Sequence, residues 1–430
     1  MTLTRDSENS TLGDSHHQHR DSVSEVCIPD ALRALHVQII GTSGVGKSCL
    51  MEHLCARDID RGRGVAVIDP HGDLAEGVMS RITEKDVNRV LYFNPAHQDL
   101  VPLLNPLARE EGLVAKIQAE DLLTVFVPLT TDLGQRLEVF MRQVFCGLIR
   151  TGAGTLADAF VLLGKESAAK KRLRLKVLEV VEDKQARHFW EREIRTYRPY
   201  DDLAHVLCRL SRLLLAKNMG VMFSQPENRF NFQDIIERGK VFIANLAGME
   251  SGVCAFLGTL LLSMLHSAAL RRKDIPDDDR QFFGIYVDDA DRFRTEVLEQ
   301  MLYCMRRYKC SVTFAHRSLS QSEQRKHVDI MGIVGATIAF NVVAEDAPQI
   351  AEFLGGHVSV EDLVALGHGE AIVRIGNDVI RLRIPSMTPA PDRSAGDRAK
   401  ELCYQKYYRL ASEILKSIPK SGLSKTSSTR

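Results

Sequence analysis

The segment GTSGVGKS, residues Gly41–Ser48, decides the interpretation of the chain, because it fits the pattern G-x-x-x-x-G-K-[S/T] without a mismatch. In such a loop the glycines let the backbone fold around a phosphate chain with its N–H groups turned inward, and Lys47 adds a positive charge. The hydroxyl of Ser48 would ligate Mg²⁺. The residues expected to contact the phosphates are Gly41, Thr42, Ser43, Gly44, Val45, Gly46, Lys47 and Ser48.

The flanking sequence supplies the strand and the helix that this loop requires. Residues 36–40 (HVQII) predict a buried strand that runs into the loop, and residues 47–57 predict a helix whose positive end faces the phosphates. A glycine-rich turn without a ligand is the alternative, and the strand and helix on either side favour the phosphate loop.

Length and composition indicate a soluble globular protein with more than one domain. The 430 residues include 56 Lys or Arg and 56 Asp or Glu, so the net charge argues neither for nor against a polyanionic partner. The nine cysteines contain no C-x-x-C pair, which predicts reduced thiols with neither disulfides nor a structural zinc. We expect a cytoplasmic protein, and any contact with the inner membrane would be peripheral and held by partners.

One segment, residues 252–270, is apolar and long enough to be mistaken for a membrane span. It contains His266 and several small residues, and it precedes a strand that ends in carboxylates. These features favour a buried helix over a span.

Short apolar runs separated by helical segments predict a mainly parallel, doubly wound α/β sheet. The predicted strands are 65–69, 89–95, 240–246, 282–288, 310–315 and 336–342, and a hairpin over 370–375 and 379–384 is predicted at the edge of the sheet. The sheet is interrupted by an all-α insertion. The expected domains are a disordered polar tail (1–28), the first part of the nucleotide-binding domain (29–108), the insertion (109–238), the second part (239–388) and a helical and disordered tail (389–430).

The run FFGIYVDD, residues 282–289, is an apolar strand that ends in two carboxylates. Asp288 would hold the Mg²⁺ shell together with Ser48, and Asp289 would polarise the attacking water. The alternative is that these carboxylates only cap the following helix. A phosphate loop requires a magnesium carboxylate, which favours the functional interpretation.

Three further residues are candidates for roles in hydrolysis. His316 and Arg317 end the next predicted strand, where a polar side chain would lie beside the γ-phosphate and could sense hydrolysis. Arg306 closes the preceding helix and could reach into the site of a neighbouring subunit to neutralise charge in the transition state. Surface solubility or phosphate contact with DNA is the alternative for both arginines.

The insertion carries a local excess of positive charge. Residues 165–217 contain fourteen Lys or Arg against eight Asp or Glu. Contact with nucleic-acid phosphates and an ordinary solvated helix surface both fit this composition.

Taken together, the motifs resemble those of the FtsK/HerA-type P-loop ATPases, and among these the cytosolic motor of type IV secretion coupling proteins. The segments that carry the resemblance are GTSGVGKS, VIDPHGDL (67–74), LYFNP, PLLNPL, VFIANLAG (241–248), IYVDDADRF (285–293), RRYKCSVTFAHRSLSQ (306–321) and ATIAFNV, followed by Asp346. They cover about residues 30 to 385, in the order that the family has them.

The resemblance implies a RecA-like fold, ATP and Mg²⁺ as cofactors, and a homo-hexameric ring that drives DNA through a central pore. It also implies that the insertion contacts DNA, a relaxase or other proteins of the secretion complex. Two positions depart from the family, which has Glu in place of Asp289 and Gln in place of Arg317. The shorter Asp289 would set the carboxylate back by about 1–1.5 Å, which can cost around 10²-fold in rate.

These features lead to two hypotheses. The first is an ATP-hydrolysing DNA translocase of a conjugative or type IV secretion-like system. The second, motivated by Asp289 and Arg317, is a nucleotide-binding assembly or recruitment factor of the same machinery that hydrolyses ATP weakly. A small-molecule kinase or a signalling GTPase is disfavoured because the chain has no N-K-x-D motif.

Overall fold

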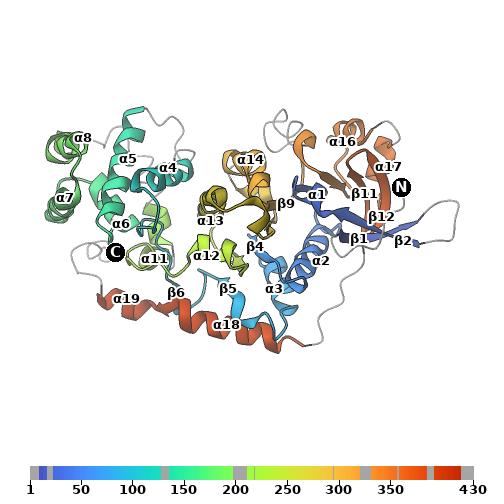
Figure 1. The fold of residues 1–430 in the computed structure, drawn as a ribbon, viewed down its shortest axis with the longest axis horizontal. Helices are drawn as coiled ribbons and strands as arrows, with labels where there is room; N and C mark the ends of the chain where they lie inside the picture. The colour runs from blue at the N-terminus through green and yellow to red at the C-terminus, as the bar shows by residue number, and fades with distance from the viewer. Residues whose placement is uncertain are drawn as a thin grey trace, which may run out of the picture. The chain divides into compact units, whose positions relative to one another are not determined.

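The computed structural model describes residues 9–16, 23–126, 135–196, 211–216, 218–293, 295–319, 331–355, 358–384 and 392–417. The chain forms two compact units, whose elements are labelled in Figure 1. The first unit comprises Met1–Phe93, Phe232–Ala247 and Leu265–Cys403. The second comprises Asn94–Asn231, Gly248–Met264 and Tyr404–Arg430.

The first unit is built on an eleven-stranded sheet with the order β2-β1-β12-β11-β10-β3-β9-β8-β4-β7-β5. Neighbours from β10 to β5 pair in parallel, and those from β2 to β10 pair antiparallel. The predicted mainly parallel α/β sheet is therefore confirmed. Its strands are β1 (Asn9–His16), β2 (Val23–Pro29), β3 (Val37–Ile40), β4 (Gly64–Asp69), β5 (Val90–Phe93), β7 (Val241–Asn245), β8 (Phe283–Val287), β9 (Cys310–His316), β10 (Ala336–Ala339), β11 (Glu370–Ile375) and β12 (Asp378–Arg383).

Helices follow most of the parallel strands, as the doubly wound pattern requires. The helices of this unit are α1 (Asp30–Arg33), α2 (Lys47–Asp60), α3 (Asp73–Ser80), α12 (Phe232–Glu237), α14 (Thr295–Cys304), α16 (Ala347–Leu354) and α17 (Val360–Val364). Short 3₁₀ turns are η1 (Val87–Arg89), η4 (Arg271–Asp274), η5 (Asp277–Asp279), η6 (Ala290–Arg292) and η7 (Met305–Tyr308). Helix α18 (Ser394–Tyr407) begins in this unit and ends in the other.

The central strands are buried over their whole length, which explains their continuous apolar sequences. Every residue of β3, β4, β7, β8 and β9 is buried. Strands covered on both faces read as apolar runs and not as alternating patterns. Polar side chains consequently collect where these strands end, at the carboxyl edge of the sheet.

The N-terminal segment differs from the expected disordered tail, because the described residues form the antiparallel pair β1 and β2. β1 also pairs with β12, so the hairpin of β11 and β12 lies inside the sheet and not at its edge. Leu12, Val26 and Ile28 are buried. Hydrogen bonds to an existing strand satisfy the polar backbone of β1, which contains a single large apolar residue.

Between residues 109 and 238 the described elements are all helices. In the second unit they are α4 (Ala115–Phe126), α5 (Gln135–Arg150), α6 (Leu156–Leu163), α7 (Ala168–Val180), α8 (Lys184–His188), the π-helical turn η3 (Phe189–Glu193), α9 (Ile194–Thr196) and α11 (Met219–Met222). The unit also contains the two-stranded sheet of β6 (Leu100–Pro102) and β13 (Tyr408–Leu410), and α19 (Ala411–Ser417). Trp190 is fully buried at its core.

Helix α13 (Ser251–Leu270) is the apolar segment that resembled a membrane span. It is long and apolar enough to cross a membrane, with a mean hydropathy of 1.9, yet 72% of that stretch is buried inside the protein. The buried helix predicted from the sequence is confirmed.

Candidate functional site

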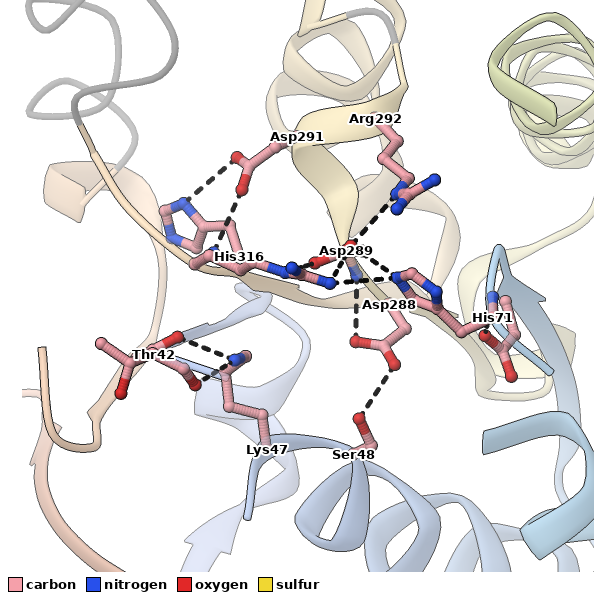
Figure 2. A network of polar contacts seen from close by, with 12 residues as sticks. Thr42, Lys47, Ser48, His71, Asp288, Asp289, Asp291, Arg292 and His316 are labelled. Carbon is pink, nitrogen blue, oxygen red and sulfur yellow. Dashed lines mark hydrogen bonds and ion pairs between the residues drawn. The ribbon is translucent and has the colours of Figure 1, made fainter. Parts of the chain in front are cut away.

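The phosphate loop joins the end of β3 to the start of α2 (Figure 2). Its shape requires glycine at several positions. Gly44 and Gly46 have φ angles of 79° and 116°, in the region that side chains rarely adopt. A Cβ atom at Gly41 would lie 2.7 Å from the Cβ of Phe340, which belongs to the neighbouring chain segment. The loop therefore needs glycine at each of these three positions.

Segments distant in sequence hold the loop in place. The N–H of Gly41 donates to the carbonyl of His316 at 3.2 Å, and the N–H of Thr42 donates to the carbonyl of Asn341 at 2.8 Å. The carbonyl of Val45 accepts from the N–H of Gly369 at 3.0 Å. The loop is thus fixed by backbone contacts from the ends of β9, β10 and the turn before β11.

Lys47 lies over the loop that precedes it. Its Nζ donates to the carbonyl oxygens of Gly41 and Thr42, each at 2.7 Å (Figure 2). Burial lowers the pKa of Lys47, and the charges of Asp288 and Asp289 act in the opposite direction. In this structure the ammonium group is therefore bonded to the loop itself.

Ser48 and Asp288, 240 positions apart in the sequence, are in direct contact. The Oγ of Ser48 donates to Oδ2 of Asp288 at 2.9 Å (Figure 2). The contact forms because α2 begins beside the carboxyl end of β8. Burial raises the pKa of Asp288, the charge of Asp69 adds to this, and the hydrogen bonds from Ser48 and from the N–H of Asp289 oppose it. This hydroxyl and carboxylate are hard oxygen donors of the kind that Mg²⁺ prefers.

Asp289 is bound by side chains on several sides. It has a left-handed backbone with φ of 47°. Its Oδ1 accepts from Nε of Arg317 at 2.8 Å, and its Oδ2 accepts from Nη2 of Arg317 and Nε2 of His71, both at 2.8 Å, and from Nε of Arg292 at 3.2 Å. Burial raises the pKa of Asp289, but the hydrogen bonds from Arg317 and His71 outweigh it and the pKa is lowered. Three of these four bonds are to Oδ2 and one is to Oδ1.

His316 and Asp291 form a second polar layer beside this carboxylate. Nδ1 of His316 lies 3.7 Å from Oδ1 of Asp291, and Nε2 of His316 contacts Nε2 of Gln38 at 2.9 Å. Asp291 accepts from the N–H of Arg317 at 3.1 Å. Burial raises the pKa of Asp291 to about 6.

Arg306 is the one candidate residue that the structure does not bring to this site. It lies exposed in η7, before the start of β9, whereas His316 ends that strand. A seven-residue strand spans about 23 Å, so Arg306 lies at the opposite edge of the sheet from the phosphate loop.

Sequence reasoning assigned no role to His71 and Arg292, although both contact Asp289. A signal for His71 existed, because it follows the buried strand β4 in the segment DPHGD. Asp69 of that segment orders the turn, since its carboxylate accepts from the N–H groups of His71 and Ala75, both at 2.8 Å. Arg292 carries no comparable signal in the sequence.

A buried ion pair joins α1 to α2, and a hydroxyl of β8 bonds to the same carboxylate. Arg33 donates from Nη1 to Oδ1 of Asp58 at 2.7 Å and from Nη2 to Oδ2, and both side chains are fully buried. The hydroxyl of Tyr286 donates to Oδ2 of Asp58 at 2.6 Å. Asp58 lies in α2 and Tyr286 in β8, so this network stabilises the pairing of the helix and strand that carry Ser48 and Asp288.

The family model for the helicase HerA central domain matches residues 18–265. The chain belongs to the HerA helicase family. It is therefore a P-loop ATPase of the FtsK/HerA type, as the sequence motifs predicted. A comparison with curated proteins found no match to the sequence.

Solved structures of other proteins have a similar fold. The plasmid coupling protein TrwB, in complex with the GTP analogue GDPNP, aligns with a TM-score of 0.64 at 13% identity over 92% of this chain and 99% of that chain. TrwB in complex with ADP and Mg²⁺ aligns with a TM-score of 0.61 at 14% identity over 90% of this chain and 97% of that chain. VirB4 of Thermoanaerobacter pseudethanolicus aligns with a TM-score of 0.61 at 17% identity over 90% of this chain and 99% of that chain. At such identities the likeness establishes the fold, which is that of the RecA-like P-loop NTPases, as predicted.

Proposed function

We propose that this chain binds ATP with Mg²⁺ at residues 41–48 and hydrolyses it to drive DNA transfer in a conjugative or type IV secretion-like system. The observation that supports this most directly is the 2.9 Å contact between Ser48 and Asp288. It brings together the two residues, from distant parts of the chain, that the proposal assigns to Mg²⁺. The similar structures of TrwB, described as a conjugative coupling protein, motivate the assignment to DNA transfer.

In this proposal the phosphate loop and the strand ends beside it have separate roles. Lys47 and the loop N–H groups would hold the phosphates, and Ser48 and Asp288 would hold Mg²⁺. Mg²⁺ is commonly bound by one or two protein oxygens together with substrate phosphates, so this pair of donors fits it. When bound, the ion would neutralise phosphate charge. Asp289 would orient the attacking water, and His316 and Arg317 would sense the γ-phosphate.

The proposed assembly is a cytoplasmic homo-hexamer that acts on DNA with a relaxase or other secretion proteins. Arg306 is exposed at the edge of the sheet far from its own phosphate loop, so it could act only in the site of a neighbouring subunit. On helix α7, the exposed Lys171, Arg172 and Lys176 are candidates for contact with DNA phosphates.

The test is ATP hydrolysis with and without DNA, for the wild type and for Lys47→Ala. We expect DNA to stimulate turnover and Lys47→Ala to abolish it. The translocase proposal fails if DNA has no effect and Lys47→Ala keeps wild-type turnover. Native mass measurement with and without nucleotide tests the hexamer, which the role of Arg306 requires.

A second candidate is a nucleotide-gated assembly or recruitment factor that hydrolyses ATP weakly. The supporting observation is that the donors of Arg317, His71 and Arg292 occupy the carboxylate of Asp289. A carboxylate so engaged, with a lowered pKa, is a poor acceptor for a proton from water. Single-turnover hydrolysis by Asp289→Glu and Arg317→Gln separates the candidates, because a large gain in the variants favours the weak hydrolase.

A further inference from the structure

Helix α7 of the second unit carries charges of opposite sign at its two ends (Figure 1). Its inner face contains Lys170, Arg174 and Val177, which are buried. The exposed residues of its outer face and of the turn that follows are Lys171, Arg172, Leu175, Lys176, Glu179, Val180, Glu182 and Asp183. The three basic residues come first and the three carboxylates come last. The outer face therefore has a basic half and an acidic half.

The stability of the helix itself does not account for this order of charges. Basic residues near the start of a helix and acidic residues near its end both oppose the helix dipole. Helix α7 has no acidic residue in its first turn and no basic residue in its last turn. A partner with the reverse order of charges would compensate both ends at once.

A groove with a volume of about 1090 Å³ lies at the acidic end of α7. Five carboxylates and two arginines line it, so the net charge of its lining is −3. Val114 and Val180 also line the groove and are 61% and 40% exposed. A segment that fits this groove should therefore be basic and should carry an exposed apolar side chain.

The first half of α7 has this chemistry, because its basic residues surround Leu175, which is 50% exposed. Arg172, Leu175 and Glu179 follow one another at intervals of three and four residues, so they share one side of the helix. Arg172 and Glu179 are also equally far in sequence from the midpoint between Leu175 and Lys176. In an antiparallel pair of α7 helices, Arg172 of each copy would thus face Glu179 of the other, whereas a parallel pair would bring like charges together.

We propose that two copies of this chain pair through antiparallel α7 helices, with the basic half of each helix in the acidic groove of the other. Such a contact is isologous, since the same surface serves both copies. The inference goes beyond the proposed function, because the contact lies within the second unit, uses no nucleotide and is not one of the head-to-tail contacts that close a ring. A paired copy cannot offer the same basic residues to DNA.

The experiment reverses the charges of one end at a time in the full chain and measures self-association by sedimentation velocity over a range of concentrations. Glu179→Lys/Glu182→Lys and Lys171→Glu/Arg172→Glu each bring like charges together, so each should weaken pairing by roughly tenfold or more. Both reversals suit the helix dipole, so a loss of pairing would not reflect unfolding. An equal mixture of the two variants should pair again, because opposite charges then meet at both ends.

Glu401→Lys/Glu413→Lys is the matched control. It makes the same change of charge at exposed positions of α18 and α19, and it should leave pairing unchanged.

Leu175→Cys provides a second measurement, because this position lies beside the twofold axis of the proposed pair. A short bismaleimide should join it to its counterpart in the second copy. Val139→Cys on α5, where the native side chain is 49% exposed, should give no more covalent dimer than the wild type.

The inference is overturned if either reversal pairs as well as the wild type, if the mixture does not recover, or if Leu175→Cys gives no more covalent dimer than Val139→Cys. Loss of DNA binding in Lys171→Glu/Arg172→Glu with unchanged pairing would assign the basic half to DNA instead. Loss of ATP hydrolysis or of the hexamer would count against the proposed function and not against this contact.

Discussion

The buried ion pair of Arg33 and Asp58 offers a quantitative test of how this domain is held together. We predict that Asp58→Asn strongly destabilises the first unit. The substitution keeps the shape of the side chain but removes the negative charge that the Arg33 guanidinium, which is 0% exposed, contacts in the native state. It also turns an amide N–H₂ group toward donors that now bond a carboxylate, namely Arg33 and Tyr286.

The magnitude follows from this burial. Removing one partner of a fully buried pair costs about 3–5 kcal/mol, and each kcal/mol lowers Tm by about 2–4 °C for a domain of about 150–250 residues. We therefore expect Tm to fall by roughly 6–20 °C, measured by calorimetry or circular dichroism. Because the carboxylate of Asp58 in α2 also accepts from the hydroxyl of Tyr286 in β8, nucleotide affinity should weaken as well.

Asp60→Asn is the matched control, because it neutralises a carboxylate at the end of the same helix. Its side chain is 59% exposed and lies 4.0 Å from Nζ of Lys85, so we expect a change within about 1 kcal/mol. The double variant Arg33→Met/Asp58→Leu, which removes both charges, should recover much of the lost stability. The reasoning is refuted if Asp58→Asn costs no more than Asp60→Asn.

Three further predictions concern other parts of the chain. Gly41→Ala should lower the free energy of unfolding by about 1–3 kcal/mol and weaken ATP binding, because the new Cβ would lie 2.7 Å from the Cβ of Phe340. Gly252→Ala, with open space around it, is the control and should leave the thermal unfolding curve unchanged. The pKa of Asp291 is raised from 3.8 to about 6, so the native state loses stability as pH rises through this window and the carboxyl group ionises. Asp291→Asn should therefore increase the free energy of unfolding by up to about 3 kcal/mol at pH 7.5 but by less at pH 5. An equal gain at both pH values would contradict this. Asn105→Ala should lower the stability of the second unit by about 1–3 kcal/mol in urea unfolding, because the buried amide donates to two backbone carbonyls at 3.0 Å, and a loss below 0.5 kcal/mol would exclude that role.

The contact of Ser48 with Asp288 could be predicted because each residue belongs to a motif that is recognisable locally. Parallel strands deliver such motifs to one edge of the sheet whatever their separation in sequence. The buried strands could be predicted for a related reason, since covering both faces leaves a continuous apolar run.

The ion pair of Arg317 and Asp289 could not be predicted, because it depends on the direction in which the Asp289 side chain points at the end of β8. That direction is set by the left-handed backbone at Asp289, which an aspartate adopts only in a suitable tertiary setting. β1 escaped prediction because its pairing with β12 relies on backbone hydrogen bonds, and Leu12 alone gives no periodic pattern.

The ties of the phosphate loop also bear on the order of events during synthesis. Val45 accepts from the N–H of Gly369, and the carbonyl of Gly369 accepts from the N–H of Ile384 at 2.7 Å, so the loop is braced by residues made more than 300 positions later. A nascent chain on the ribosome carries the complete motif long before it carries these supports. ATP binding should therefore begin only after nearly the whole protein has been synthesised. Prematurely terminated chains should not bind ATP, even though they contain every residue of the motif.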